Sequence, residues 1–104
     1  MTQTQVMSLI EAPKAAAYTV LDVRSAEEFS EGHVPGATNI SHSTLADKLS
    51  MLPSDKSQLI VVYCRSGRRA GVAEDILANA GYTNVWHMDG DMKAWQRNNL
   101  PTQK

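Results

Sequence analysis

The chain has 104 residues with 10 basic and 11 acidic side chains, so its formal net charge at pH 7 is -1. This length predicts one domain, spanning residues 1–104, that buries a single core. The near-neutral balance of charge gives no reason to expect a nucleic acid or an anionic membrane surface as a partner, and the longest apolar stretch is too short to span a bilayer.

In chain order, predicted strands alternate with predicted helices, which is typical of an α/β fold whose parallel sheet is flanked by helices on both faces. The N-terminal segment lacks the basic region of a signal peptide. It is otherwise ambiguous, because Pro13 interrupts any helix that begins at Gln3. We expect a central sheet of about five strands, and four of them are residues 18–23, 38–40, 59–63 and 85–88.

Helical segments are predicted between and after these strands. Ser25 and Glu28 form a capping-box pattern for a short helix that packs Phe29 inward and ends near Gly32. Leu45, Leu49 and Leu52 mark a further helical segment. A helix is predicted over 70–80, with Gly81 as its C-cap and with an inner face formed by Val72, Ile76, Leu77 and Ala80. A last helix over 92–98 carries Trp95.

The only cysteine, Cys64, stands where the strand 59–63 ends and the arginine-rich segment 65–69 begins. A turn that leads from a strand into a helix points backbone N–H groups and the positive end of the helix at the sulfur. Together with three arginines, this favours the thiolate, which is the nucleophilic form of cysteine. The same turn is suited to bind an anion. The alternative is that Cys64 is a small buried hydrophobic residue at the end of a strand.

The length of the turn separates the reactions that such a thiolate could perform. It could attack the outer sulfur of thiosulfate, a phosphoryl group or arsenate. Cysteine phosphatases resemble one another in a C-x5-R loop, whereas only four residues separate Cys64 from Arg69, and Ala70 stands where such a phosphatase would have its arginine. The tighter turn favours a cysteine that carries one extra sulfur, while a cysteine phosphatase or arsenate reductase stays an alternative.

Three motifs in order resemble the rhodanese family of sulfurtransferases. Residues 64–69 are similar to its active-site loop, C-x-x-G-x-R. Residues 21–24 with Glu28-Phe29, and then residues 32–40, are similar to its D-V-R, E-F and G-H-I-P-G-A-x-N-I motifs. The resemblance identifies a single-domain rhodanese and implies the α/β fold that the predicted elements also indicate.

A weaker match lies near the C-terminus. Asp89-Gly90 with Trp95 resembles the family's G-G-x-x-x-W, and Leu100-Pro101 resembles the end of its G-L-P. In this comparison Asp89 and Asn99 stand in place of glycines. Since Asp and Asn tolerate left-handed backbone better than other residues, we expect both turns to form.

The resemblance implies a thiosulfate sulfurtransferase that moves a sulfane sulfur from thiosulfate or a persulfide donor to a thiol or cyanide through a persulfide on Cys64. The alternative in another class is a non-catalytic rhodanese-like module that carries sulfur or docks on a protein. The expected partners are a small anionic sulfur donor and a thiol acceptor, such as a small redox or sulfur-carrier protein. No cofactor, metal, nucleic acid or membrane is expected, and the chain is expected to be a monomer.

The candidate site residues divide into three roles. Cys64 is the nucleophile, and the substrate-binding group consists of Arg65, Ser66, Gly67, Arg68 and Arg69. Ser66 either donates its hydroxyl to the bound sulfur or caps the next helix. Two supporting residues complete the set: Asp22 is expected to hold Arg69 or a loop amide, and Arg24 to pair with Glu28 or Glu31.

The histidines are not expected to form a metal site. His33 is predicted to be a structural hydrogen-bonding group, and His42 and His87 lie far apart without the spacing of metal ligands. A single cysteine excludes a disulfide within the chain, which favours a reducing cytoplasm as its location.

Overall fold

The structure, a computed structural model, describes residues 1–12 and 17–104. In the described residues four parallel strands form one sheet in the order β2-β1-β3-β4. The strands are β1 (Tyr18–Asp22), β2 (Thr38–Asn39), β3 (Leu59–Tyr63) and β4 (Val85–His87). The predicted parallel α/β sheet is therefore confirmed, with four strands in place of about five.

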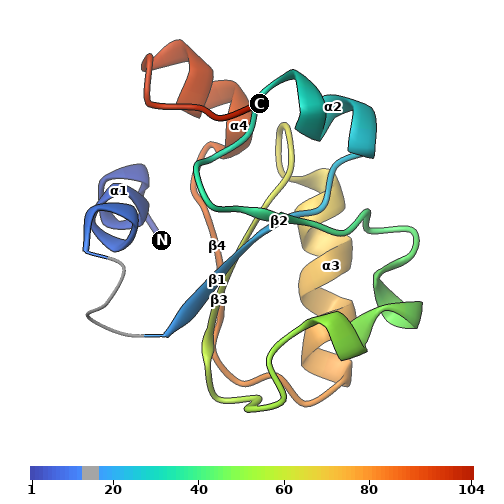
Figure 1. Cartoon of the computed structure of the whole chain (residues 1–104). Helices are drawn as coiled ribbons and strands as arrows, with labels where there is room; N and C mark the ends of the chain where they lie inside the picture. The colour runs from blue at the N-terminus through green and yellow to red at the C-terminus, as the bar shows by residue number, and fades with distance from the viewer. Residues whose placement is uncertain (13–16) are drawn as a thin grey trace.

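The helices cover both faces of this sheet (Figure 1). They are α1 (Gln3–Glu11), α2 (Ala26–Glu31), α3 (Arg68–Asn79) and α4 (Asp91–Arg97), with two 3-10 helices, η1 (Leu45–Asp47) and η2 (Leu49–Met51). No helix in the described part of the chain combines the length and the apolar character that crossing a membrane requires.

Two hydrophobic clusters hold the helices to the sheet. Successive side chains of a strand point to opposite faces, so the two central strands, β1 and β3, contribute to both clusters. The cluster beside α3 contains Leu21, Ile60, Val62 and Leu77. The cluster beside α1 and α4 contains Val6, Val20, Val61 and Trp95.

The N-terminal segment, ambiguous from the sequence, forms a helix. The Thr2 hydroxyl accepts the N–H of Gln5, and the Gln5 side chain accepts the N–H of Thr2. This reciprocal cap fixes the start of α1. The helix ends at Glu11, and Pro13, which the sequence analysis singled out as a helix breaker, lies outside the described residues.

The capping box at Ser25 and the helix that follows it are confirmed, because α2 begins directly after Ser25. Phe29, expected to pack inward, is instead half-buried and stacks on the ring of His33 with the ring centroids 3.6 Å apart. The His33 Nδ1 atom lies 2.8 Å from the carbonyl oxygen of Phe29. His33 is thus a structural hydrogen-bonding group, as predicted.

Two further helical predictions need correction. The segment marked by leucines forms two separate 3-10 turns, η1 and η2, which is the short connecting form this helix type usually takes. In α3 the buried residues are Ala70, Ala73 and Leu77. This spacing defines an inner face that excludes Val72, which is 45% exposed, so the prediction for Val72 was wrong.

The topology brings the ends of three strands to one edge. Because the strands are parallel, their carboxyl ends lie together, and ligands of open α/β sheets bind at that edge. The chain leaves β1 toward Arg24, leaves β3 at Cys64 and leaves β4 toward Asp91.

Candidate active site

The loop after Cys64 turns tightly into α3. Gly67 is the N-cap of α3 with φ +113°, a left-handed conformation that favours glycine. The N–H of Gly67 donates to the Sγ atom of Cys64 over 3.0 Å. No side chain of the described residues caps this helix end, so Ser66 does not have the capping role considered for it.

Asp22 and Arg24 form a buried pair, which corrects both expected pairings. Arg24 Nη2 lies 2.7 Å from Asp22 Oδ2 and also donates to the carbonyl oxygen of Gly32 over 2.8 Å. The Tyr63 hydroxyl donates to the same carboxylate over 2.7 Å and accepts the N–H of Val34. Asp22 therefore holds neither Arg69 nor a loop amide. Arg24 lies two residues beyond the end of β1, close enough in the chain for its guanidinium to reach back to the carboxylate of Asp22.

This pair also shapes the ionisation of its neighbours. Burial raises the pKa of Tyr63, and the negative charge of Asp22 adds to that effect. Burial alone would lower the pKa of Arg24, but the hydrogen bonds and charge of Asp22 raise it overall. Both side chains thus keep the proton that they donate.

Arg69, the arginine of the loop motif, pairs with Glu28 of α2 instead of with Asp22. Its Nη1 and Nη2 atoms lie 2.6 Å and 3.0 Å from the two carboxylate oxygens. The hydrogen bond from Arg69 lowers the pKa of Glu28 to about 2. The same bond raises the pKa of Arg69. This bidentate pair connects α2 to the first turn of α3.

Asp91 is a site residue that the sequence analysis missed. It is 2% exposed, and its Oδ1 atom accepts the N–H of Cys64 over 3.0 Å and lies 2.8 Å from His87 Nε2. A signal was present in the sequence. Counted back from Trp95, the pattern G-G-x-x-x-W places Gly90 and Asp91, and not Asp89, at its two glycine positions.

The backbone agrees with this corrected register. Gly90 has φ +78° and Asp91 has φ +53°, whereas Asp89 is not among the residues with positive φ. A left-handed conformation costs a residue with a side chain about 1–2 kcal/mol, and less for Asp and Asn. Asn99 also has φ +53°, so the expectation that it replaces a turn glycine is confirmed.

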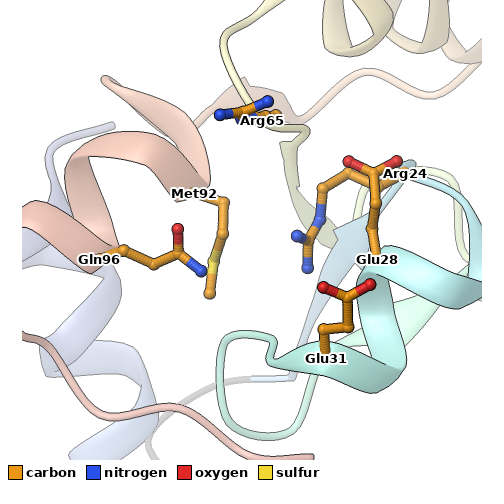
Figure 2. A pocket seen from close by; sticks show the side chains of 6 residues that line it. All are labelled: Arg24, Glu28, Glu31, Arg65, Met92 and Gln96. Carbon is orange, nitrogen blue, oxygen red and sulfur yellow. The ribbon is translucent and has the colours of Figure 1, made fainter.

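Two cavities flank the loop. One of about 330 Å³ lies between α2 and α4 and is lined by Arg24, Glu28, Glu31, Arg65, Met92 and Gln96. Figure 2 shows Arg65 above this cavity, with α2 and α4 on opposite sides of it. The other, of about 470 Å³, is lined by His42, Ser66, Arg68, Arg69 and Val72. The loop arginines are thus divided between a cavity with two acidic residues and a cavity with none.

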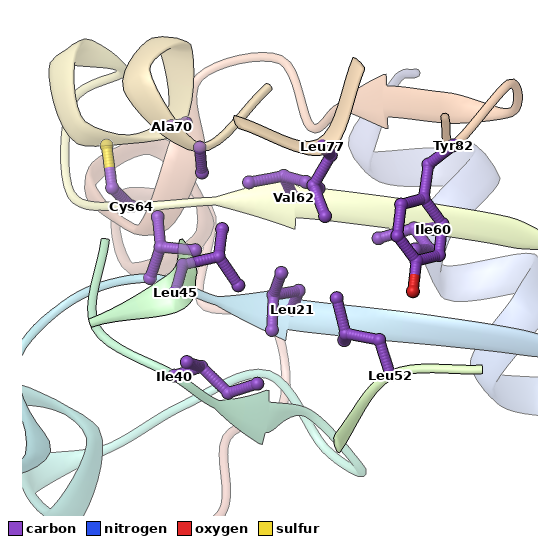
Figure 3. Close-up of a cluster of buried hydrophobic side chains, with 12 residues drawn as sticks. Leu21, Ile40, Leu45, Leu52, Ile60, Val62, Cys64, Ala70, Leu77 and Tyr82 are labelled. Atoms are coloured by element: carbon purple, nitrogen blue, oxygen red, sulfur yellow. The ribbon is translucent and has the colours of Figure 1, made fainter. Parts of the chain in front are cut away.

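The thiol itself is buried, which differs from the accessible nucleophile that the proposed chemistry needs. Cys64 is 1% exposed and belongs to the same cluster as Leu45 and Ala70. Figure 3 shows its sulfur pointing from the end of β3 toward the first turn of α3. The burial agrees with the alternative of a small buried residue, whereas the N–H of Gly67 on the sulfur agrees with a thiolate site.

The remaining histidine of interest, His42, lies at the second cavity. Its Nδ1 atom is the one buried side-chain nitrogen or oxygen of the described residues that has no hydrogen-bond partner. Within residues 1–12 and 17–104, no group of three or more histidine, cysteine and acidic side chains is placed to hold a metal ion.

Comparison with known proteins identifies the family. The model of the rhodanese-like domain matches residues 2–98. Thiosulfate sulfurtransferase PspE of Escherichia coli is 37% identical over 78 residues, which cover 75% of either chain. The chloroplastic thiosulfate sulfurtransferase 16 of Arabidopsis thaliana is 39% identical over 98 residues, which cover 85% of this chain and 82% of the relative.

A solved structure shows the same fold. A rhodanese with anions from Escherichia coli superposes with a TM-score of 0.71 and 33% identity, covering 85% of this chain and 99% of the other. The resemblance carried by the loop, D-V-R and G-H-V-P-G-A motifs is thus confirmed. The chain belongs to the rhodanese-like domain family.

Proposed function

We propose that this protein is a thiosulfate sulfurtransferase that works through a persulfide on Cys64. The Cys64 thiolate attacks the outer sulfur of thiosulfate, the sulfur–sulfur bond of the donor breaks, and sulfite leaves with the electron pair. An acceptor thiolate or cyanide then attacks the outer sulfur of the persulfide and regenerates the Cys64 thiolate. The two steps exchange one sulfur atom without an external oxidant or reductant.

The contact that carries this proposal is the 3.0 Å hydrogen bond from the Gly67 N–H to the Cys64 sulfur. It lies at the N-terminus of a twelve-residue helix, whose partial positive charge stabilises an anion. A cysteine that serves only as a packed hydrophobic residue does not need such a donor. The names of the two curated relatives support the same activity class.

The charges around the loop suggest where the donor binds. Arg69 is already paired with Glu28. Arg65 and Arg68 have no ion-pair partner among the described residues. Arg68 shares its cavity with Ser66 and with no acidic side chain, so a dianionic donor meets only cationic and neutral groups there. We therefore assign donor binding to the cavity of Ser66 and Arg68.

Access to the sulfur is a requirement of this proposal. Since Cys64 is 1% exposed, the loop must shift before thiosulfate reaches the sulfur. The same burial supports the second candidate function, a rhodanese-like module that docks on another protein without transferring sulfur. The two candidates differ in whether the thiol accepts a sulfur atom.

The decisive experiment is an intact mass measurement after incubation with thiosulfate. We expect the protein to gain one sulfur atom, to lose it on addition of cyanide, and not to gain it as Cys64→Ser. A parent protein that gains no sulfur, but whose fold is intact, would identify the docking module. Phosphate release from a phosphate ester, measured in parallel, tests the phosphatase alternative and is expected to be absent.

A further inference from the structure

Asp91 packs directly behind the Cys64 loop, and we propose that it is a positioning residue for Cys64 that His87 holds in place. Its Oδ1 atom accepts the N–H of Cys64 over 3.0 Å and lies 2.8 Å from the Nε2 atom of His87. The Asp91 side chain is buried, whereas His87 is 33% exposed, so the histidine closes the outer side of the carboxylate.

The start of α4 holds the loop through its backbone as well. The N–H of Met92 donates to the carbonyl oxygen of Cys64 over 2.9 Å, and the N–H of Lys93 donates to the carbonyl oxygen of Arg65 over 3.0 Å. The Asp91 side chain supplies the remaining bond, to the N–H of Cys64. Both backbone polar groups of Cys64 are thus bonded to α4, which fixes the point from which its sulfur extends.

The Asp91 carboxylate also lies close to Gly67, at the other end of the loop from the Cys64 N–H group. A Cβ atom placed on Gly67 would lie 3.3 Å from Asp91 Oδ2 and 3.4 Å from His87 Cε1. Gly67 is the residue whose N–H donates to the Cys64 sulfur. Asp91 and His87 therefore bound the space in which both the backbone of Cys64 and its hydrogen-bond donor sit.

Asp91 has a left-handed backbone conformation, which glycine adopts more easily than a residue with a side chain. A glycine would adopt φ +53° without strain but would leave the N–H of Cys64 and the ring of His87 without this partner. Strained residues that persist are typical of sites with a function. We infer that the hydrogen bonds of the Asp91 carboxylate, which fix the loop, offset the cost of the left-handed backbone at this residue.

This inference rests on the proposed function for its effect on rate. Asp91 lines neither of the two cavities beside the loop, so donor binding should not depend on it. A displaced sulfur, in contrast, slows attack on the donor, because misplacement by an ångström near the reacting atoms can cost about 100-fold. The expected signature is a change in kcat with an unchanged KM for thiosulfate.

The test compares Asp91→Gly, Asp91→Asn and a matched control, Asn99→Gly, which removes a side chain from the same φ of +53° outside the site. At saturating thiosulfate we expect Asp91→Gly to form the persulfide about 10- to 100-fold more slowly, with KM within about twofold. Asp91→Asn keeps an oxygen for the Cys64 N–H and should recover most of the rate. Asn99→Gly should match the parent protein.

A second measurement does not depend on sulfur transfer. The backbone amide of Cys64 should be protected from hydrogen exchange in the parent protein and in Asp91→Asn, and should lose that protection in Asp91→Gly, while the amides of β3 keep theirs. Failure of the parent to form a persulfide would remove the proposed function, but this amide would still decide whether Asp91 positions Cys64.

His87→Ala covers the case in which Asp91→Gly does not fold. The ring is partly exposed, so its loss should leave the fold intact while the Asp91 carboxylate loses the partner that holds it. We expect a loss in rate of about 3- to 10-fold. Unchanged rates and unchanged protection of the Cys64 amide in Asp91→Gly, or in His87→Ala where the former is unfolded, would overturn the inference.

Discussion

Two ion pairs lie near the carboxyl edge of the sheet, and their surroundings differ. In the Asp22–Arg24 pair the side chains are 0% and 5% exposed, whereas in the Glu28–Arg69 pair they are 31% and 28% exposed. The first pair connects β1 to Tyr63 of β3 and to the backbone of Gly32. The second connects α2 to the helix that follows the active-site loop.

The Asp22–Arg24 pair has a structural role, whereas the Glu28–Arg69 pair acts on the active-site loop. Asp22 and Arg24 belong to a motif of the rhodanese family, yet their hydrogen bonds go to each other, to Tyr63 and to the turn at Gly32. Glu28, in contrast, contacts an arginine of the loop itself. A motif residue near an active-site loop can therefore serve the frame on which the loop is built.

The largest effect is expected from removing one partner of the buried pair. Asp22→Ala leaves the Arg24 guanidinium buried without its counterion and the Tyr63 hydroxyl without its acceptor, which should lower the free energy of unfolding by about 3–5 kcal/mol. Urea denaturation followed by circular dichroism measures this loss. Glu28→Ala is the matched control at the half-exposed pair and should cost about 1 kcal/mol or less.

Equal losses in these two variants would contradict the comparison, because they would mean that burial does not distinguish the pairs. The double variant Asp22→Leu/Arg24→Met sharpens the result. Replacing both members of a buried pair by apolar side chains is often much less costly than removing one. We therefore expect the double variant to be more stable than Asp22→Ala.

An intermediate effect is expected from acid at the Glu28–Arg69 pair. Since the folded state lowers the pKa of Glu28 from 4.5 to about 2, the pair stabilises the protein above the unfolded pKa and loses that contribution as the pH falls from about 4.5 to about 2. Glu28 is partly exposed, so solvent screening limits the contribution to about 1 kcal/mol. The free energy of unfolding, measured across this range, should fall more in the parent protein than in Glu28→Gln.

Parallel pH curves for the parent protein and Glu28→Gln would show that the pair adds nothing to stability. The curves should instead differ near neutral pH, approach each other as the pH falls through about 2, where Glu28 is half protonated in the folded protein, and meet only below that pH. High salt should reduce the difference, because a half-exposed pair is screened.

Most of the frame could be predicted from local sequence patterns. The apolar run 59–63 and the Ser25 capping box each encode an element within a few residues, and both elements formed where expected. The Cys64 turn was also recognisable, because its chemistry depends on neighbours in sequence. Predictions failed where the burial of a residue depends on the orientation of its helix. Val72 is exposed because α3 packs a different face against the sheet.

The partners of the site residues could not be predicted for a similar reason. Arg69 and Glu28 are 41 residues apart, and Cys64 and Asp91 are 27 apart, so their contacts exist only once the sheet has brought its strand ends together. The burial of the Cys64 thiol likewise depends on how η1 and α3 cover it. For Asp91 alone, a correct count from Trp95 would have pointed to the position.

The smallest effect is expected from Arg69→Lys. Lysine keeps the positive charge near Glu28 but loses the parallel pair of hydrogen bonds that Arg69 makes at 2.6 Å and 3.0 Å. Because this pair is half-exposed, water replaces the lost bond, and the free energy of unfolding should fall by about 0.5 kcal/mol or less. Arg24→Lys makes the same exchange inside the buried network, where the Arg24 side chain is only 5% exposed, and should cost about 1–3 kcal/mol. Thermal unfolding of both variants measures the two losses of stability. A larger loss for Arg69→Lys than for Arg24→Lys would contradict the conclusion that the Asp22–Arg24 pair is the structural one.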